Sequence, residues 1–193
     1  MMDKRQKAIL NFWFGDPHSP DYGQPRSQWF EKDPAFDQQI RDQFETDYWQ
    51  AMAGHLNHWV SSAAGCLALV LLQDQFPRNL FRNTPQAFAS DAHALEVAET
   101  AIAQGFDRQL LPVQRWFIYL PFEHSEDLAT QERSLQLWEE LRDHPASASC
   151  IEYAQRHYEV IRQFDRFPHR NEILGRDSTP AELEFLLQPG SRF

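Results

Sequence analysis

Apolar side chains recur every four residues along much of this chain, and this spacing constrains the fold more than any other feature. The longest series indicates one long amphipathic helix, because its members share a helical face: Phe36, Ile40, Phe44, Tyr48, Met52 and Leu56. No segment shows the alternation with β-branched residues that is typical of strands. The 15 Phe and 6 Trp among 193 residues supply the apolar area for one core. We therefore expect a single all-α domain over residues 1–193, made of antiparallel helical hairpins.

Capping residues and prolines predict where the helices begin and end. Ser62 is expected to cap one helix, and Ser125 another, with Glu126 in its first turn. Proline disfavours helical geometry in the residue before it, so Pro77 and Pro121 are each expected to end a helix. The predicted helices cover residues 3–14, 33–56, 62–72, 84–105, 112–120, 125–141 and 150–164, and a short one follows a capping box at 179–182.

The net charge of −10 bears on the kinds of partner that the protein can have. Nucleic acids and anionic membranes attract proteins with a positive surface field, so we expect neither as a partner. No apolar run approaches the ~20 residues needed to cross a bilayer, and the first residues lack the pattern of a signal peptide. Cys66 and Cys150 lie in apolar helical runs, which favours buried free thiols. A cytoplasmic protein is the expectation.

One polar motif occurs twice in the chain. Gln-Phe-Pro-Arg-Asn covers residues 75–79, and Arg-Phe-Pro-His-Arg-Asn covers residues 166–171. Each copy is expected at the end of an apolar helix and before a Thr-Pro helix start, which suggests internal pseudo-symmetry. The motif admits two interpretations: its residues end a helix and satisfy the last carbonyls, or its polar groups line a shared pocket. The candidates for such a pocket are Arg78, Asn79, His169, Arg170 and Asn171.

A third motif, Leu-Pro-Phe-Glu-His-Ser-Glu-Asp, concentrates ionisable groups at residues 120–127. His124 and Glu126 are candidates for an acid–base pair, because imidazole titrates near neutral pH. The alternative is a simple helix start, in which Ser125 is the cap and Glu126 interacts with the helix dipole. The residues alone leave both interpretations open.

These motifs, with Ile-Leu-Asn-Phe-Trp-Phe-Gly at residues 9–15 and Thr-Pro-Ala-Glu at 179–182, resemble the bacterial family known as Domain of Unknown Function 924. The resemblance covers nearly the whole chain. It implies an all-α fold similar to that of tetratricopeptide-repeat proteins, and it implies no activity, because none is established for the family. The family typically has glycine where this chain has Asp165. Asp165 is therefore set aside as an equivalent of Asp74, and Asp74 is kept as a candidate.

The motifs support three hypotheses. The first is a protein that binds a small anionic molecule or peptide, through Arg78, Asn79, His124, His169, Arg170 and Asn171. The second is a hydrolase, with His124 as general acid or base, oriented by Glu126 or Asp74. The third is purely structural, with Arg78 and Arg170 paired to Asp74 and Glu126.

Motifs for cofactors and metals are weak or missing in the sequence. His55 and His58 share a helical face but lack the further ligands of a metal site. There is no glycine-rich phosphate loop and no nucleophile elbow. We therefore expect neither a metal nor a cofactor. The identity of the ligand and the oligomeric state are beyond what the residues predict.

Overall fold

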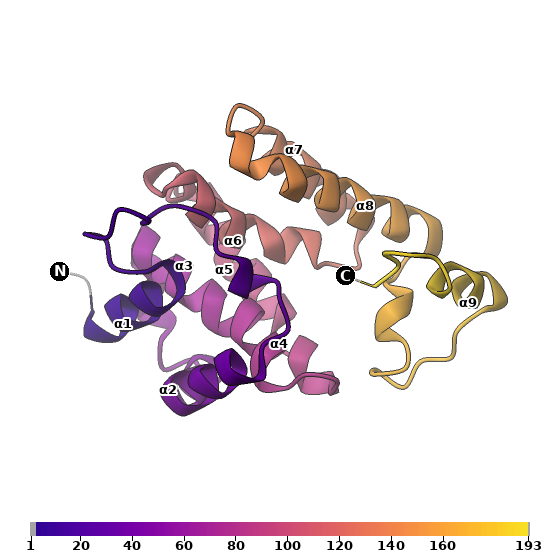
Figure 1. Cartoon of the computed structure of the whole chain (residues 1–193), viewed down its shortest axis with the longest axis horizontal. Coiled ribbons are helices and arrows are strands. Elements are labelled where there is room, and N and C mark those ends of the chain that lie inside the picture. The colour runs from indigo at the N-terminus through magenta and orange to yellow at the C-terminus, as the bar shows by residue number, and fades with distance from the viewer. Residues whose placement is uncertain (1–2, 193) are drawn as a thin grey trace.

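The structure is a computed structural model that describes residues 3–192, and every regular element in this range is a helix (Figure 1). The α-helices are α1 (Lys4–Phe14), α2 (Pro34–Met52), α3 (Ala63–Val70), α4 (Phe76–Leu80), α5 (Asp91–Ala103), α6 (Pro112–Glu123), α7 (Leu128–Glu139), α8 (Ala148–Phe164) and α9 (Pro180–Leu186). The predicted all-α fold class is confirmed, while the likeness to tetratricopeptide repeats stays a prediction. Within residues 3–192, none of the helices is long and apolar enough to span a bilayer.

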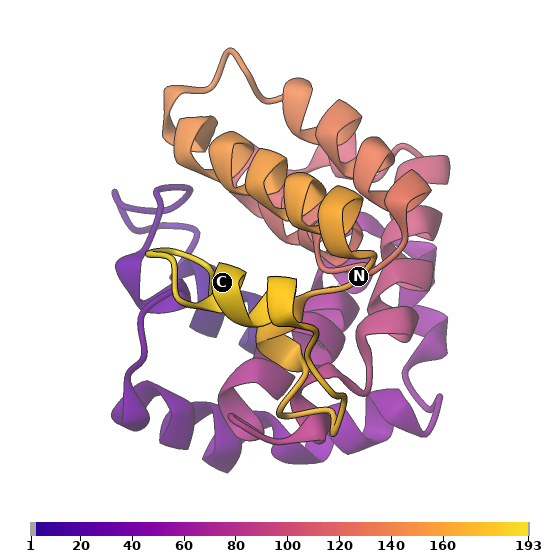
Figure 2. The same cartoon turned by 90° about the vertical axis from the view of Figure 1, so that its right-hand side faces the viewer.

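Helix α3 lies at the centre of the fold. It packs against α1, α5 and α6, and its residues from Gly65 to Val70 are all buried. A helix that is apolar all round is stabilised by burial on every side. The α7–α8 hairpin packs on α6. The segment that follows α8 and ends in α9 lies at one end of the molecule, at the right of Figure 1 and in front in Figure 2.

Aromatic side chains fill much of the space between the helices. The ring of Trp13 is fully buried, and its centroid lies 5.5 Å from that of Phe76 and 5.6 Å from that of Phe117. Trp29 stacks on Trp13 with centroids 6.2 Å apart. Pairs of this kind contribute about 0.5–1.5 kcal/mol beyond their area of burial. The predicted inner face of α2 is also confirmed, since these four residues are buried: Phe36, Ile40, Phe44 and Tyr48.

The predicted caps explain where several helices begin. The Asp33 carboxylate and the Ser62 hydroxyl each accept a hydrogen bond from a backbone N–H in the first turn of α2 and α3. Thr179 and Glu182 form the predicted capping box of α9. Such caps satisfy donors that the helix itself leaves unpaired and stabilise it by ~1 kcal/mol each. Helix α2 ends at Met52, one turn earlier than predicted.

The prediction that Pro77 ends a helix is wrong. The chain continues from α3 through a π-helical turn at Leu71–Gln75 into α4, where Pro77 is the second residue. Pro77 has no N–H to offer the carbonyl of Gln73, and the Ser90 hydroxyl donates to that carbonyl instead, at 2.6 Å. A π-turn holds one extra residue within the helix and is frequent at functional sites. Here the turn contains Asp74, which is fully buried.

The chain between α6 and α7 also differs from the prediction. Pro121 does not end helix α6, which continues past it and ends at Glu123. Helix α7 is capped by Asp127 rather than Ser125, since the Asp127 carboxylate accepts hydrogen bonds from both the backbone N–H and the hydroxyl of Thr130. Glu126 therefore lies outside the helix, where its carboxylate contacts other parts of the chain.

The two copies of the repeated motif adopt different backbone conformations, so the predicted pseudo-symmetry is wrong at these turns. The first copy lies within the continuous α3–α4 helix, whereas the second follows α8 and forms a 3-10 turn at Pro168–Arg170. Helix α8 ends because Asp165 has a φ of 56°, a left-handed conformation that suits glycine best. The Thr-Pro sites differ too: after Thr84 the chain forms a 3-10 turn, Pro85–Phe88, and α5 begins only at Asp91.

Candidate functional site

Asp74 and His124 form a hydrogen-bonded pair where the π-turn meets the end of α6. His124 Nδ1 lies 2.7 Å from Asp74 Oδ1. The second carboxylate oxygen of Asp74 accepts a hydrogen bond from the Gln75 amide. The structure thus brings together two of the three residues that the sequence suggested for acid–base chemistry, although they are 50 positions apart.

Asp91, at the start of α5, lies between the two arginines of the repeated motif. Arg78 donates to both carboxylate oxygens of Asp91, at 3.1 and 3.2 Å, and also lies 3.3 Å from Asp74 Oδ1. Arg170 approaches from the segment after α8, with Nη1 3.4 Å from Asp91 Oδ2. Ser90 is the residue that satisfies the carbonyl freed by Pro77. That contact holds the start of α5 against the π-turn.

Burial and neighbouring charges determine the protonation of the Asp74–His124 pair. Burial and then the positive charge of Arg78 lower the pKa of His124, and the charge of Asp74 offsets them only in part. Burial raises the pKa of Asp74, but Arg78 and His124 outweigh it, so that pKa is lowered. Near neutral pH the site therefore holds a carboxylate and a neutral imidazole. The imidazole donates Nδ1–H to Asp74, which leaves the Nε2 lone pair as an acceptor.

The two arginines differ in how well their charges are compensated. Burial lowers the pKa of Arg78, but the charges of Asp74 and Asp91 outweigh it, so the pKa is raised. Arg170 is only 6 % exposed, and burial lowers its pKa to about 10 in spite of Asp91. The Arg170 Nε atom is buried and has no hydrogen-bond partner within residues 3–192. Arg170 is thus a buried cation whose charge is incompletely compensated.

Arg170 and His124 line a pocket of about 400 Å³ between α5, the end of α6 and the segment after α8. Apolar residues form much of its wall, among them Phe88, Leu95, Pro121 and Leu174. Its other polar residues are Asp91, Ser125 and Glu126. A concave site with apolar walls and a few converging polar groups is the usual form of a small-molecule binding site.

Four of the predicted ligand-binding residues lie outside the lining of this pocket: Arg78, Asn79, His169 and Asn171. Asn79 Nδ2 donates to Asp37 Oδ1 at 2.7 Å and so connects α4 to α2. Asn171 Nδ2 donates to the hydroxyl of Ser178 at 3.0 Å and holds the segment before α9. The ring of His169 packs against that of Phe167, with centroids 5.6 Å apart. The two asparagines therefore have structural partners.

Glu126 lines the pocket but pairs with an arginine that the sequence motifs did not single out. Its carboxylate accepts hydrogen bonds from Arg176 at 2.6 and 2.9 Å and from the Phe167 N–H at 2.8 Å. The predicted pairing of Arg170 with Glu126 is therefore wrong, because Arg176 occupies Glu126 and Arg170 contacts Asp91. Between the two candidates for orienting His124, the one in contact with its ring is Asp74.

A second carboxylate–histidine pair lies beside the first, and the sequence reasoning missed it. His157 Nδ1 lies 3.0 Å from Glu123 Oε1, and both residues are buried. The ring centroids of His124 and His157 are 6.2 Å apart. The available signal was Glu123, an acidic residue next to His124 on an apolar helix. No group of three His, Cys, Asp or Glu side chains in the described range is arranged to hold a metal ion.

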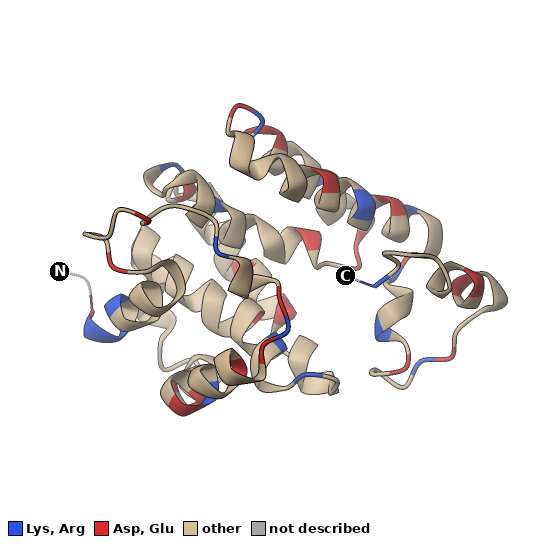
Figure 3. Cartoon of the chain, viewed as in Figure 1, with Lys and Arg blue, Asp and Glu red and all other residues tan. Residues whose placement is uncertain are grey.

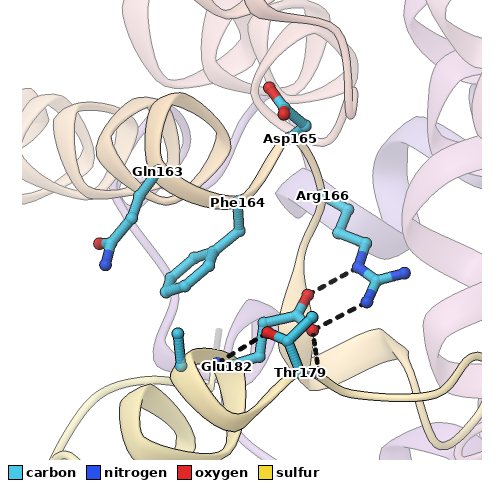
Figure 4. A pocket seen from close by; sticks show the side chains of 7 residues that line it. Gln163, Phe164, Asp165, Arg166, Thr179 and Glu182 are labelled. Atoms are coloured by element: carbon cyan, nitrogen blue, oxygen red, sulfur yellow. Dashed lines mark hydrogen bonds and ion pairs between the residues drawn. The ribbon is translucent and has the colours of Figure 1, made fainter.

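A larger hollow of about 500 Å³ lies between the end of α8 and α9 (Figure 4). Arg166 donates to both carboxylate oxygens of Glu182 there, at 2.6 and 2.8 Å. Glu182 also completes the capping box with Thr179. Arg166 and Glu182 thus have structural partners, and Asp165, the other charged residue of the lining, is exposed. Elsewhere, acidic and basic residues are interspersed along the helices (Figure 3). The pocket at Arg170 is therefore the stronger candidate.

Comparisons with known proteins place the chain among proteins of unknown function. A family model described as "Bacterial protein of unknown function (DUF924)" matches residues 9–190. The chain is similar to the solved structure of a protein of unknown function from Agrobacterium tumefaciens, with 38 % sequence identity and a TM-score of 0.84. The match covers 95 % of this chain and 97 % of the Agrobacterium chain. No curated protein matches the chain.

Proposed function

The chain belongs to the bacterial DUF924 family, and we propose that it binds a small molecule or short peptide carrying an anionic group in the pocket lined by Arg170 and His124. The observation that carries this proposal is the state of Arg170. Its guanidinium is buried at the pocket, its one contact with Asp91 is long at 3.4 Å, and its Nε has no partner in the described range. A carboxylate or phosphate group is the ligand that a guanidinium fork binds best.

The electrostatic balance of Arg170 favours an anion on energetic grounds. A pKa lowered to about 10 means that the folded protein compensates this positive charge less well than water does. An anion that enters the pocket would restore the missing compensation inside a region of low dielectric constant, where the attraction is strong. Arg78 has no such deficit, because Asp74 and Asp91 already raise its pKa. We therefore assign ligand contact to Arg170 and a supporting position to Arg78.

Arg170→Gln should weaken the binding of 4-methylpentanoate, used as a carboxylate probe, at least tenfold in titration calorimetry. The glutamine keeps a polar side chain but loses the charge and the fork, which are worth more than one neutral hydrogen bond. Arg108→Gln is the matched control, since the Arg108 side chain is 74 % exposed. A dissociation constant within twofold of the wild-type value, in an Arg170→Gln protein with unchanged circular dichroism, would contradict the proposal.

A second candidate function is hydrolysis of an anionic substrate, and the Asp74–His124 contact of 2.7 Å favours it. A neutral imidazole held by a buried carboxylate is suited to remove a proton from water or from a hydroxyl group. Arg170 would then face the negative charge that develops on the substrate.

The test of hydrolysis uses two anionic probes, the ester mono-p-nitrophenyl succinate and p-nitrophenyl phosphate. Turnover should fall at least a hundredfold in His124→Gln, because general base catalysis typically contributes 10²–10⁴-fold. Its rate should rise with pH through an apparent pKa below the ordinary histidine value, since the pKa of His124 is lowered. Equal rates in the wild type and in His124→Gln would exclude this function for both substrate classes.

We also propose a cytoplasmic location. Its support is that Cys66 and Cys150 are both free thiols, as is usual for proteins of a reducing compartment. A peptide ligand is compatible with the tetratricopeptide-like fold that the family resemblance implies, since such helical arrays commonly present concave binding surfaces.

A further inference from the structure

The carboxylates at the Arg170 pocket are already paired within the protein. Arg78 donates to both carboxylate oxygens of Asp91, and Arg176 donates to both of those of Glu126. Arg170 is different, because its contact with Asp91 is long, at 3.4 Å, and its buried Nε has no partner within residues 3–192. Among the described residues that line the pocket, the incompletely compensated charge is therefore a single cation.

A single uncompensated cation favours a ligand with a single negative charge. One carboxylate would complete the compensation of Arg170. A second negative charge would meet Asp91 and Glu126, which already have arginine partners, so nothing in the described lining would offset the loss of its hydration. His124 leaves this count unchanged near neutral pH, because its neutral ring donates to Asp74 and keeps a lone pair on the other nitrogen. Phosphate monoesters, which are mostly dianionic at pH 7.5, are therefore disfavoured relative to carboxylates.

Two aromatic rings hold the Arg170 guanidinium in place. Its carbon atom lies 4.4 Å from the ring centroid of Phe167 and 4.8 Å from that of Phe88. The face of an aromatic ring attracts a cation, so these contacts favour one position of the side chain before any ligand arrives. Such preorganisation reduces the entropy that binding costs, and the planar fork of the guanidinium matches the two oxygens of a carboxylate.

Much of the pocket wall is apolar and comes from three parts of the chain. Leu95 belongs to α5, Pro121 to α6 and Leu174 to the segment after α8, while Phe88 precedes α5. The volume of about 400 Å³ suits a small molecule. Each methylene group buried here would strengthen binding about two- to fourfold, since its removal from water is favourable. The wall therefore fits an apolar chain attached to the anionic group.

We infer that the ligand is a monocarboxylate with a short apolar chain. Its carboxylate contacts Arg170, and its chain lies against Leu95 and Leu174. This inference rests on the proposed binding of an anionic group by Arg170, and it adds to that proposal the single charge, the carboxylate and the apolar chain. Dicarboxylates and phosphate monoesters bind more weakly, because their second negative charge finds no cation in the described lining that lacks a partner.

Titration calorimetry with the full-length protein at pH 7.5 tests the charge and the chain separately, with four probes: hexanoate, acetate, hexanedioate and hexyl phosphate. Acetate lacks the apolar chain, hexanedioate carries a second carboxylate at its far end, and hexyl phosphate replaces the carboxylate with a dianion. Hexanoate should bind at least tenfold more tightly than each of the other three.

Equal affinity for hexanoate and acetate would overturn the apolar chain, and equal or tighter binding of hexanedioate or hexyl phosphate would overturn the single charge. In each of these outcomes, a loss of binding in Arg170→Gln would leave the proposed anion binding intact. If none of the four probes binds, the inference and the proposed function are overturned together.

Leu174→Ala tests the apolar wall, with Leu183→Ala as its matched control, because Leu183 is 55 % exposed on α9 and lies outside the lining of the pocket. Leu174→Ala should reduce the preference for hexanoate over acetate at least threefold, whereas Leu183→Ala should leave the preference unchanged. A preference that stays at the wild-type value in a folded Leu174→Ala protein would overturn the placement of the chain. If Leu174→Ala does not fold, the wild-type comparison of the four probes still decides between the outcomes.

Discussion

Replacing Asp74 with alanine should lower the free energy of unfolding by about 3–5 kcal/mol, because it removes one partner of a fully buried ionic network. The carboxylate accepts hydrogen bonds from His124 and Gln75 and faces the guanidinium of Arg78. His124 and Gln75 would each lose the partner of a buried donor, and Arg78 would keep Asp91 but lose its second carboxylate. Each lost partner costs the desolvation of the group left behind. Urea unfolding followed by circular dichroism at 222 nm measures the loss.

Two controls separate the network from ordinary side-chain truncation. Asp42→Ala, at an exposed position of α2, should change stability by no more than about 0.5 kcal/mol. Asp74→Asn keeps the shape of the side chain and one acceptor oxygen. Its loss of unfolding free energy should therefore lie between the losses of Asp74→Ala and Asp42→Ala. A loss below about 1 kcal/mol for Asp74→Ala would contradict the network.

The pH dependence of stability gives the same prediction an independent readout. The folded pKa of Asp74 is lowered, so the unfolded chain binds a proton more readily than the folded one. The stability from this group is fully present above the unfolded pKa of about 3.9 and is lost as pH falls toward the folded value. Stability of the wild type should therefore drop more steeply below pH 4 than that of Asp74→Asn. Parallel curves would contradict the assigned charge.

Gly65→Ala should also be strongly destabilising, with a loss of about 3 kcal/mol or more in the free energy of unfolding. Gly65 lies in the first turns of α3 with ordinary helical geometry, where alanine would normally stabilise a helix by about 0.5–1 kcal/mol. Here an added Cβ would collide with the backbone carbonyl group of Trp59, whose carbon atom would be only 2.9 Å away. The Cβ would also lie 3.0 Å from Gln6 Nε2. The carbonyl belongs to the backbone of the preceding turn, which packs against α3, so it cannot give way as the end of a flexible side chain could, and overpacking of this kind is costly.

Gly105→Ala is the matched control for this position. Gly105 has a φ of +66° and no atom within 4 Å of an added Cβ, so its replacement strains only the backbone and should cost about 1 kcal/mol. Thermal and urea unfolding of both variants gives the comparison. An unfolding free energy of Gly65→Ala equal to or above that of the wild type would show that α3 does not approach Trp59 as closely as described.

The sequence predicts those parts of the fold that depend on local signals. The spacing of Phe36, Ile40, Phe44 and Tyr48 is sufficient to place the buried face of α2, and Asp33 and Ser62 are sufficient to place two helix starts. Pro77 misleads because a distant hydroxyl, that of Ser90, satisfies the carbonyl that it leaves unpaired. A local rule for proline cannot anticipate a partner from the next helix.

The candidate site, too, is predictable from the sequence only in part. The types of residue at its centre follow from the motifs, since Asp74, His124 and Arg170 were all candidates. Asp91 belongs to none of the motifs, yet it connects the two arginines, and Arg176 occupies the carboxylate that the motifs paired with Arg170. Such pairings depend on how α5 and the segment after α8 pack against α6, and a single sequence does not report that packing.

The π-turn of Leu71–Gln75 limits how this protein can change over evolutionary time. Its polar residues Gln73, Asp74 and Gln75 are buried in the middle of a helix that also forms the centre of the core. Substitutions of Asp74, the partner of His124, therefore also threaten folding, so few of them can accumulate. Leu95 and Leu174 on the wall are only half buried. Relatives with new ligand preferences should therefore arise by changes in the wall, while the buried Asp74 that holds His124 is preserved by its role in folding.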